Sequence, residues 1–173
     1  MNLIVTCSRH LEEEASGEIL EVLNELGDAT PRAGHGRFSG IVVVSTALDP
    51  FEVVRKMKEK ILSEPWSVRY CHRFIPIQES TKATVDANVS AVQRHVGKML
   101  PGESYRITVE KRGSDISTKD LIESIAKTVT NKVSLEKYDW NILVETFGDI
   151  AGVSILKEDD ILSTMKLKRD STE

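Results

Sequence analysis

Two stretches in the middle of the chain decide the fold: Tyr70–Ile77, which reads YCHRFIPI, and Ser104–Ser114, which reads SYRITVEKRGS. The first stretch ends in a run of apolar residues and reads as part of a strand. In the second, apolar and polar side chains alternate, which is the pattern of a β-strand with one buried face. Pro76 lacks a backbone donor and restricts the preceding residue to extended geometry, so it shapes the exit from the first strand. The second strand ends in the basic pair Lys111-Arg112 and a turn of small residues.

This arrangement resembles a THUMP domain, and the resemblance covers residues 69–156. In that family an Arg-apolar-apolar-Pro element leads into a helix, and an alternating strand later ends in a Lys-Arg pair and a small-residue turn. THUMP domains are RNA-binding modules of proteins that modify tRNA. The resemblance therefore implies a module that binds the structured part of tRNA, near its acceptor end.

An N-terminal lobe is predicted for residues 1–80. Apolar periodicity, β-branched runs and turn residues indicate strands at Leu3–Cys7, Phe38–Val44 and Val68–Gln78, and helices at Leu11–Leu26 and Asp49–Leu62. If residues 28–34 contain a short further strand, the order is β-α-β-β-α-β, which is that of a ferredoxin-like fold.

A second α/β lobe, the THUMP core, is predicted for residues 81–157. Its expected elements are a helix at 84–98, a strand at 105–109, a helix capped within 114–118, and strands at 140–146 and 151–156 joined by a turn at Gly148-Asp149. Residues 158–173 form a C-terminal tail, and we expect its last part, Met165–Glu173, to be frayed or cut from a longer chain. The fold class is therefore α/β (α+β).

Composition excludes several classes of protein. The chain has 173 residues with 40% hydrophobic content, and its longest apolar run, Ile41–Val44, is far shorter than the roughly 20 residues that span a bilayer. The first residues carry no basic region typical of a secretory signal. Cys7 and Cys71 are too few for a disulfide framework, and we expect both to be reduced, although a bridge between them stays open. We expect a cytoplasmic protein that contacts neither membrane nor DNA.

The net charge of −4 hides an uneven distribution. Residues 69–140 carry 12 Lys and Arg against 9 Asp and Glu, whereas residues 1–68 carry 7 against 11 and residues 141–173 carry 4 against 7. Binding to phosphate depends on the potential within about 8 Å at physiological salt, so an acidic chain can still present a basic face.

Basic residues of the middle segment are the candidate RNA ligands. They are Arg73, Lys82, Arg94, Lys98, Lys111 and Arg112, and Lys119, Lys127, Lys132 and Lys137 extend the possible track. An arginine offers a planar fork of donors that suits phosphate. For Arg73 the alternative is an ion pair with Glu79 or with an acidic residue of a helix. For the Lys111-Arg112 pair the alternative is an ordinary solvated turn.

No catalytic site is predicted. The chain has no Gly-x-Gly-x-x-Gly loop and no Ser-Gly-Gly-x-Asp-Ser loop, and its four histidines lack the spacing of metal ligands or of an acid–base pair. We therefore expect no catalytic residue, no metal and no cofactor.

The N-terminal half narrows the resemblance. Leu3–Cys7, the acidic helix after it and the GHGRFSGI stretch, residues 34–41, resemble the single-THUMP adaptors of tRNA cytidine acetylation. The resemblance implies a non-enzymatic protein that presents tRNA to a separate RNA cytidine acetyltransferase, which forms 4-acetylcytidine. Two alternatives remain: a detached THUMP module of a thiolation or methylation system, and a ferredoxin-like binding module unrelated to RNA.

Overall fold

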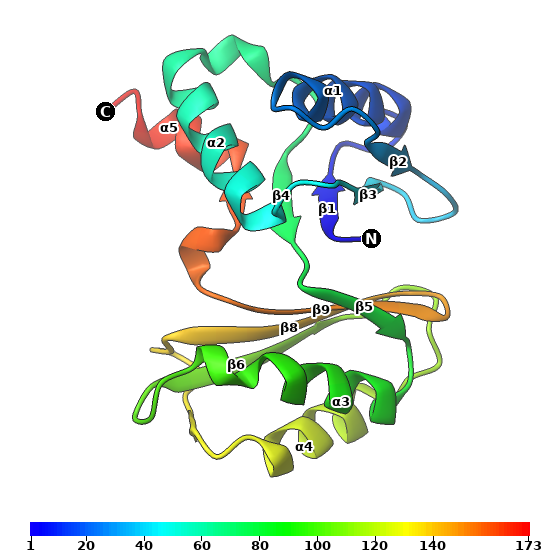
Figure 1. Ribbon diagram of the computed structural model, residues 1–173, viewed down its shortest axis with the longest axis vertical. Coiled ribbons are helices and arrows are strands. Elements are labelled where there is room, and N and C mark those ends of the chain that lie inside the picture. The colour runs from blue at the N-terminus through cyan, green and yellow to red at the C-terminus, as the bar shows by residue number, and fades with distance from the viewer. The chain divides into compact units, whose positions relative to one another are not determined.

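A computed structural model describes residues 1–173 and divides them into two compact units (Figure 1). Unit 1 contains Met1–Pro76 and Asp159–Glu173, and unit 2 contains Ile77–Glu158. Each unit has its own sheet of five strands and its own hydrophobic core.

Unit 1 has the predicted ferredoxin-like topology. Its elements are β1 (Leu3–Thr6), α1 (Glu12–Glu25), β2 (Arg32–Gly34), β3 (Ile41–Ser45), α2 (Pro50–Ser63), a 3-10 turn (Pro65–Ser67), β4 (Arg73–Pro76), β10 (Leu162–Ser163) and α5 (Thr164–Asp170). The strand order is β10-β4-β1-β3-β2, and all neighbours are antiparallel. The order β4-β1-β3-β2 is that of two interlocked βαβ halves.

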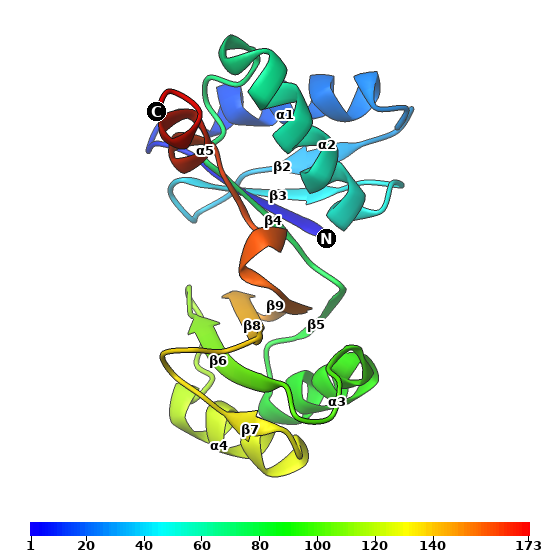
Figure 2. The same cartoon turned by 90° about the vertical axis from the view of Figure 1, so that its left-hand side faces the viewer.

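Both long helices of unit 1 cover one face of its sheet (Figure 2). Ala15, Ile19 and Leu23 of α1 pack with strand residues such as Val5 and Phe74, and the apolar side of α2 completes this core. Local signals set the start of α2, because Asp49 accepts a hydrogen bond from the Phe51 N–H at 2.9 Å and Pro50 occupies the first helical position.

Most of the segment that we expected to be frayed, Met165–Glu173, lies in α5. Leu162 and Ser163 form β10, which pairs with Phe74 and Arg73 of β4, and α5 packs against α2. Leu162 is buried in the core of unit 1. The expectation for Met165–Glu173 was wrong because α5 packs against α2, which lies far earlier in the chain, and local composition does not reveal such a contact.

Unit 2 contains the predicted α-β-α-β-β series with extra edge strands. Its elements are β5 (Glu79–Lys82), α3 (Val85–His95), a 3-10 turn (Val96–Lys98), β6 (Ser104–Glu110), α4 (Thr118–Thr128), β7 (Lys132–Val133), β8 (Trp140–Phe147) and β9 (Ile150–Leu156). The strand order is β5-β9-β8-β6-β7, in which β6 is parallel to β8 and β7 and the other neighbours are antiparallel.

The core of unit 2 lies between its sheet and the two helices, which cover the same face (Figure 2). Leu121 and Ile125 of α4 are fully buried against Ile142, Val144 and their neighbours on the sheet. Their spacing of four places them on one side of the helix, as the sequence predicts.

The division between the units lies after Pro76 and not after residue 80. The strand predicted at 68–78 is shorter in the structure, where β4 covers only Arg73–Pro76. It is also separate from β5, because β4 pairs with β1 in unit 1 whereas β5 pairs with β9 in unit 2. The YCHRFIPI stretch thus contributes its strand to unit 1, so a resemblance counted from residue 69 includes one strand of the preceding lobe.

No helix is at once long and apolar enough to span a bilayer. No group of three or more His, Cys, Asp or Glu side chains is arranged to hold a metal ion. Both cysteines are free thiols, and burial is the main cause that raises the pKa of Cys71 far above its ordinary value.

The role of the C-terminal segment can be tested with Leu162→Ala. Removal of a buried leucine side chain costs about 2–5 kcal/mol of unfolding free energy, so the variant should be destabilised by an amount in this range in urea. Met165→Ala in the same segment is the control, because Met165 is 69% exposed and should change stability by no more than about 0.5 kcal/mol. Equal stability of the two variants would mean that the segment is not part of the core.

Candidate nucleic-acid interface

Three of the six candidate residues gather at one end of the sheet of unit 2. Lys82 is the last residue of β5, and Lys111 and Arg112 directly follow β6. The strand directions place the carboxyl ends of β5, β6 and β8 at the same edge. We call Lys82, Lys111 and Arg112 the carboxyl-edge cluster.

The turn between β8 and β9 joins the two loops that carry this cluster. The Gly148 N–H donates to the carbonyl of Arg112 at 2.9 Å, and the Ala83 N–H donates to the carbonyl of Asp149 at 2.9 Å. Gly148 has φ = 65°, a left-handed conformation that glycine adopts without steric cost. One hairpin turn therefore holds both loops at a fixed separation.

Both helices of unit 2 begin at this end of the sheet. Thr84 caps α3 by accepting from the Ala87 N–H at 3.2 Å, and Ser117 caps α4 by accepting from the Asp120 N–H at 3.2 Å. The amino end of a helix carries partial positive charge and free N–H groups, both of which favour a phosphate. Lys82 precedes the first helix and Lys111 the second, so cations and helix ends lie together.

Acidic side chains reduce the positive electrostatic potential at the carboxyl edge of the sheet. They include Glu110 at the end of β6, Asp86 and Asp120 in the first helical turns, Asp115 in the β6–α4 loop and Asp149 in the hairpin turn. Unit 2 as folded carries 11 Lys and Arg against 12 Asp and Glu, since it includes Glu145, Asp149 and Glu158, which lie outside the 69–140 segment. Any attraction for phosphate is therefore local and comes from the placement of a few cations.

Arg112 is a partner of a carboxylate within the protein. Its Nη1 lies 2.6 Å from Oε2 of Glu145, whose side chain is 3% exposed, and its guanidinium stacks over the Phe147 ring at 5.3 Å. The Arg112 side chain itself is only 27% exposed. Arg112 is thus not the solvent-facing cation that the solvated-turn interpretation implied. Lys111 is exposed and donates to the carbonyl of Ile116 at 3.0 Å.

Arg94 and Lys98 lie away from this cluster, at the opposite end of α3. Both the Nε and Nη2 atoms of Arg94 bond the Glu79 carboxylate, with the shortest distance 2.6 Å, and this arginine is the first cause that lowers the pKa of Glu79. His95 lies 2.8 Å from the same carboxylate. The ammonium of Lys98 is 5.8 Å from the Trp140 ring centre, with that of Lys157 at 4.9 Å.

Arg73 belongs to unit 1, where it begins β4 opposite Thr6 of β1. It is exposed, and its expected alternative partner, Glu79, is instead engaged by Arg94. The structure therefore brings Lys82, Lys111 and Arg112 together, separates Arg94 and Lys98 from them, and places Arg73 in the other unit.

The sequence analysis did not single out Lys157. Its ammonium group and that of Lys98 both lie over the Trp140 ring, although the two lysines are far apart in the chain. No local pattern could have found it, because the link runs through a strand pairing. The sequence analysis also did not select the exposed cations Arg32 and Arg37 of the β2–β3 hairpin. A long stretch without acidic residues around them could have indicated these two arginines.

Comparison with known structures agrees with this fold. PH1313 from Pyrococcus horikoshii Ot3 is similar with a TM-score of 0.66 and 16% identity, over 91% of this chain and 55% of that chain. TrmN from Thermus thermophilus has a TM-score of 0.54 and 15% identity, over 90% of this chain and 45% of that one. A 4-thiouridine synthetase, solved as a complex with RNA and bound ATP, has a TM-score of 0.53 and 12% identity, over 94% and 42%.

The chain thus spans about half the length of these structures, and identities this low show a shared fold. No curated protein sequence matches the chain. The family model of the THUMP domain matches residues 77–156, which begins at the first residue of unit 2 and ends with β9. Residues 77–156 are therefore a THUMP domain, and they make up nearly all of unit 2.

Proposed function

We propose that this chain is a tRNA-binding adaptor of tRNA modification, which presents tRNA to a separate acetyltransferase for formation of 4-acetylcytidine. The observation that carries the proposal is the THUMP domain at 77–156, with lysines and two helix amino ends gathered at one edge of its sheet. Such an edge suits phosphate contacts, which supply affinity and register without reading sequence.

The chain's own contribution is the positioning of RNA. Shape, unpaired ends and 2′-hydroxyl groups distinguish structured RNA, whereas phosphate contacts hold it in place. Acetyl-CoA and ATP would bind to the partner enzyme. The proposed role is consistent with the cytoplasmic location expected from the sequence.

A second candidate is a THUMP module that serves a thiolation or methylation enzyme. It is favoured by the similar solved structures, which include a 4-thiouridine synthetase and a predicted N6-adenine-specific DNA methylase from Listeria monocytogenes. The identity of the partner enzyme separates the two candidates.

The carboxyl-edge cluster can be tested with the double variant Lys82→Ala, Lys111→Ala. Removal of one phosphate contact should reduce the slope of log K against log salt by about 1, so the slope should fall by about 2 while affinity for tRNA drops. Gel shift or fluorescence titration across salt measures both quantities.

The matched control is Lys127→Ala, Lys132→Ala, which removes the same charge at the other end of the sheet. Lys127 lies in the last turn of α4, and Lys132 pairs with the first residue of β6. If the control weakens binding as much as the test variant, the interface does not lie at the carboxyl edge. If wild-type protein binds no tRNA at about 50 mM salt, the proposed function is wrong.

Arg112→Ala should act on folding, in contrast to the lysines. Glu145 would lose a charged hydrogen-bond partner, and such bonds contribute about 1.5–3 kcal/mol, so unfolding free energy in urea should fall by this amount. Lys119→Ala is the control, because Lys119 is exposed and should change stability by no more than about 0.5 kcal/mol. Unchanged stability with weakened RNA binding would assign Arg112 to the RNA instead.

The adaptor role can be tested by reconstitution. The purified chain with unmodified tRNA, acetyl-CoA and ATP should yield no modified base, whereas addition of an RNA cytidine acetyltransferase should yield 4-acetylcytidine faster than the acetyltransferase alone. Nucleoside mass spectrometry gives the product. Product from the chain alone would refute the adaptor, and a thiolated or methylated base with another co-purified enzyme would favour the second candidate.

A further inference from the structure

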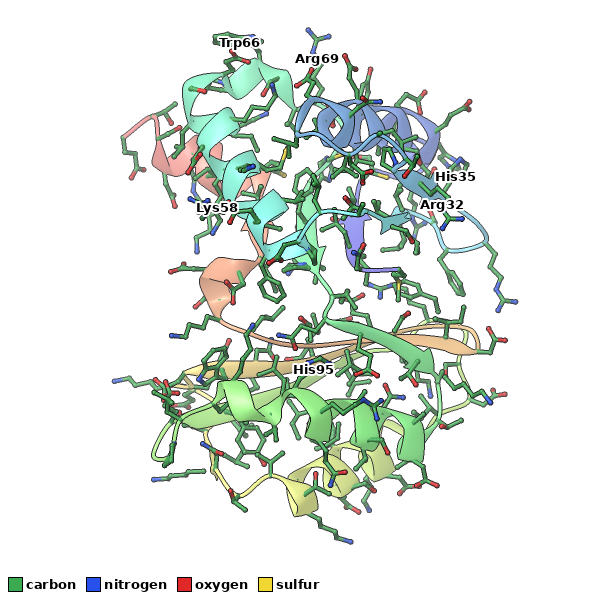
Figure 3. All side chains as sticks on the ribbon, in the orientation of Figure 1. Arg32, His35, Lys58, Trp66, Arg69 and His95 are labelled. Carbon is green, nitrogen blue, oxygen red and sulfur yellow. The ribbon has the colours of Figure 1, made fainter.

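The β2–β3 hairpin of unit 1 forms a cationic arm at the edge of its sheet. β2 is the outermost strand, and the loop that joins it to β3 extends past the strand ends (Figure 1). From Ala29 to Leu48 the chain has no acidic residue, and Arg32, His35 and Arg37 are all exposed. Figure 3 shows Arg32 and His35 on this hairpin.

The acidic residues that flank the arm are already engaged. Asp28 is buried and accepts hydrogen bonds from the Thr46 hydroxyl at 2.6 Å and from the Ala47 N–H at 2.9 Å. Asp49 caps α2. No ion pair joins Arg32 or Arg37 to a carboxylate, whereas the arginines at 55, 94 and 112 are each paired with a glutamate.

Glu12 is the acidic side chain from another element that reaches the base of the arm. Its Oε1 accepts from the Gly40 N–H at 2.7 Å, and this bond is the first cause that lowers the pKa of Glu12. Gly40 has φ = 75°, and a Cβ there would lie 2.9 Å from the carbonyl oxygen of Cys7, so only glycine fits without a shift. The base of the arm is therefore anchored to α1 and β1, while its tip carries the cations.

The Arg37 side chain packs over an aromatic ring of the same hairpin. Its guanidinium lies over the Phe38 ring, 5.1 Å from the centroid, which reduces the rotamers it must give up on binding. The same contact covers a face of the aromatic ring, so the arm does not offer an open platform on which a base could stack. Exposed guanidinium groups without such a platform suit phosphate oxygens.

We propose that the β2–β3 hairpin is a second RNA-binding site, on unit 1, that takes the phosphate backbone of a double-helical part of the RNA. The proposal rests on the proposed function and adds to it the class of RNA structure bound. Side chains cannot read the deep, narrow major groove of A-form RNA, so Arg32 and Arg37 contact phosphates along its edge. Binding at this site is therefore independent of base sequence.

The test is the full-length double variant Arg32→Ala, Arg37→Ala, titrated across salt with tRNA, with a blunt RNA duplex and with a single-stranded RNA. Affinity for tRNA and for the duplex should fall roughly tenfold near 0.1 M salt, and the log–log salt slope should fall by about 2. The control is Lys56→Ala, Lys166→Ala, which removes the same charge from exposed sites on α2 and α5 and should retain wild-type affinity. Circular dichroism melting checks that all variants are folded.

The outcomes separate this site from the proposed function. If the arginine variant binds tRNA with the affinity and the salt slope of the wild-type chain, the β2–β3 hairpin is not an RNA-binding site, whereas the proposed tRNA-binding role is unaffected. A drop in affinity for the single-stranded RNA alone, or an equal drop in the control variant, would also overturn it. Failure of the wild-type chain to bind any RNA would overturn both proposals.

Discussion

The parallel pairing of β6 with β8 is the constraint on which the THUMP domain depends. Parallel neighbours cannot be joined by a tight turn, so the chain must cross the sheet through α4 before β8 begins. The crossover puts the end of β6, the start of α4 and the end of β8 at one edge. The antiparallel return through β9 then aligns β5 so that its last residue, Lys82, reaches the same edge. The carboxyl-edge cluster is thus a consequence of topology.

Charge alone does not identify the residues that contact RNA. Arg94 and Arg112 are both arginines of the THUMP domain, yet each is bonded to a carboxylate of the same unit. An arginine that is already paired must break that bond before it can neutralise a phosphate, so its ion pair is lost when RNA binds. Lysines and arginines without such partners carry no comparable cost, which is why Lys82 and the β2–β3 hairpin are better candidates than the paired arginines.

The C-terminal segment shows how unit 1 is closed by residues that follow the THUMP domain. The chain leaves unit 1 after Pro76, forms the whole of unit 2, and returns to add β10 and α5 beside β4 and α2. Unit 2 is therefore an insertion between two parts of unit 1 in sequence. Folding of unit 1 requires both parts, because Leu162 lies in its core, so the two lobes cannot be separated by one cut of the chain.

The sequence by itself determined the long helices and the central strands and their order, because these follow from local periodicity, but not the short edge strands β5, β7 and β10 or the helix α5. The spacing of Leu121 and Ile125 predicts α4, the β-branched run at 41–44 predicts β3, and the order β-α-β-β-α-β predicts the ferredoxin-like sheet, all of which the structure confirms. Only the tertiary structure decided which cations are engaged by carboxylates. The Arg94–Glu79 and Arg112–Glu145 pairs join residues 15 and 33 positions apart, and β10 pairs with a strand still more distant. Such contacts depend on which strands become neighbours, and local composition carries no record of that choice.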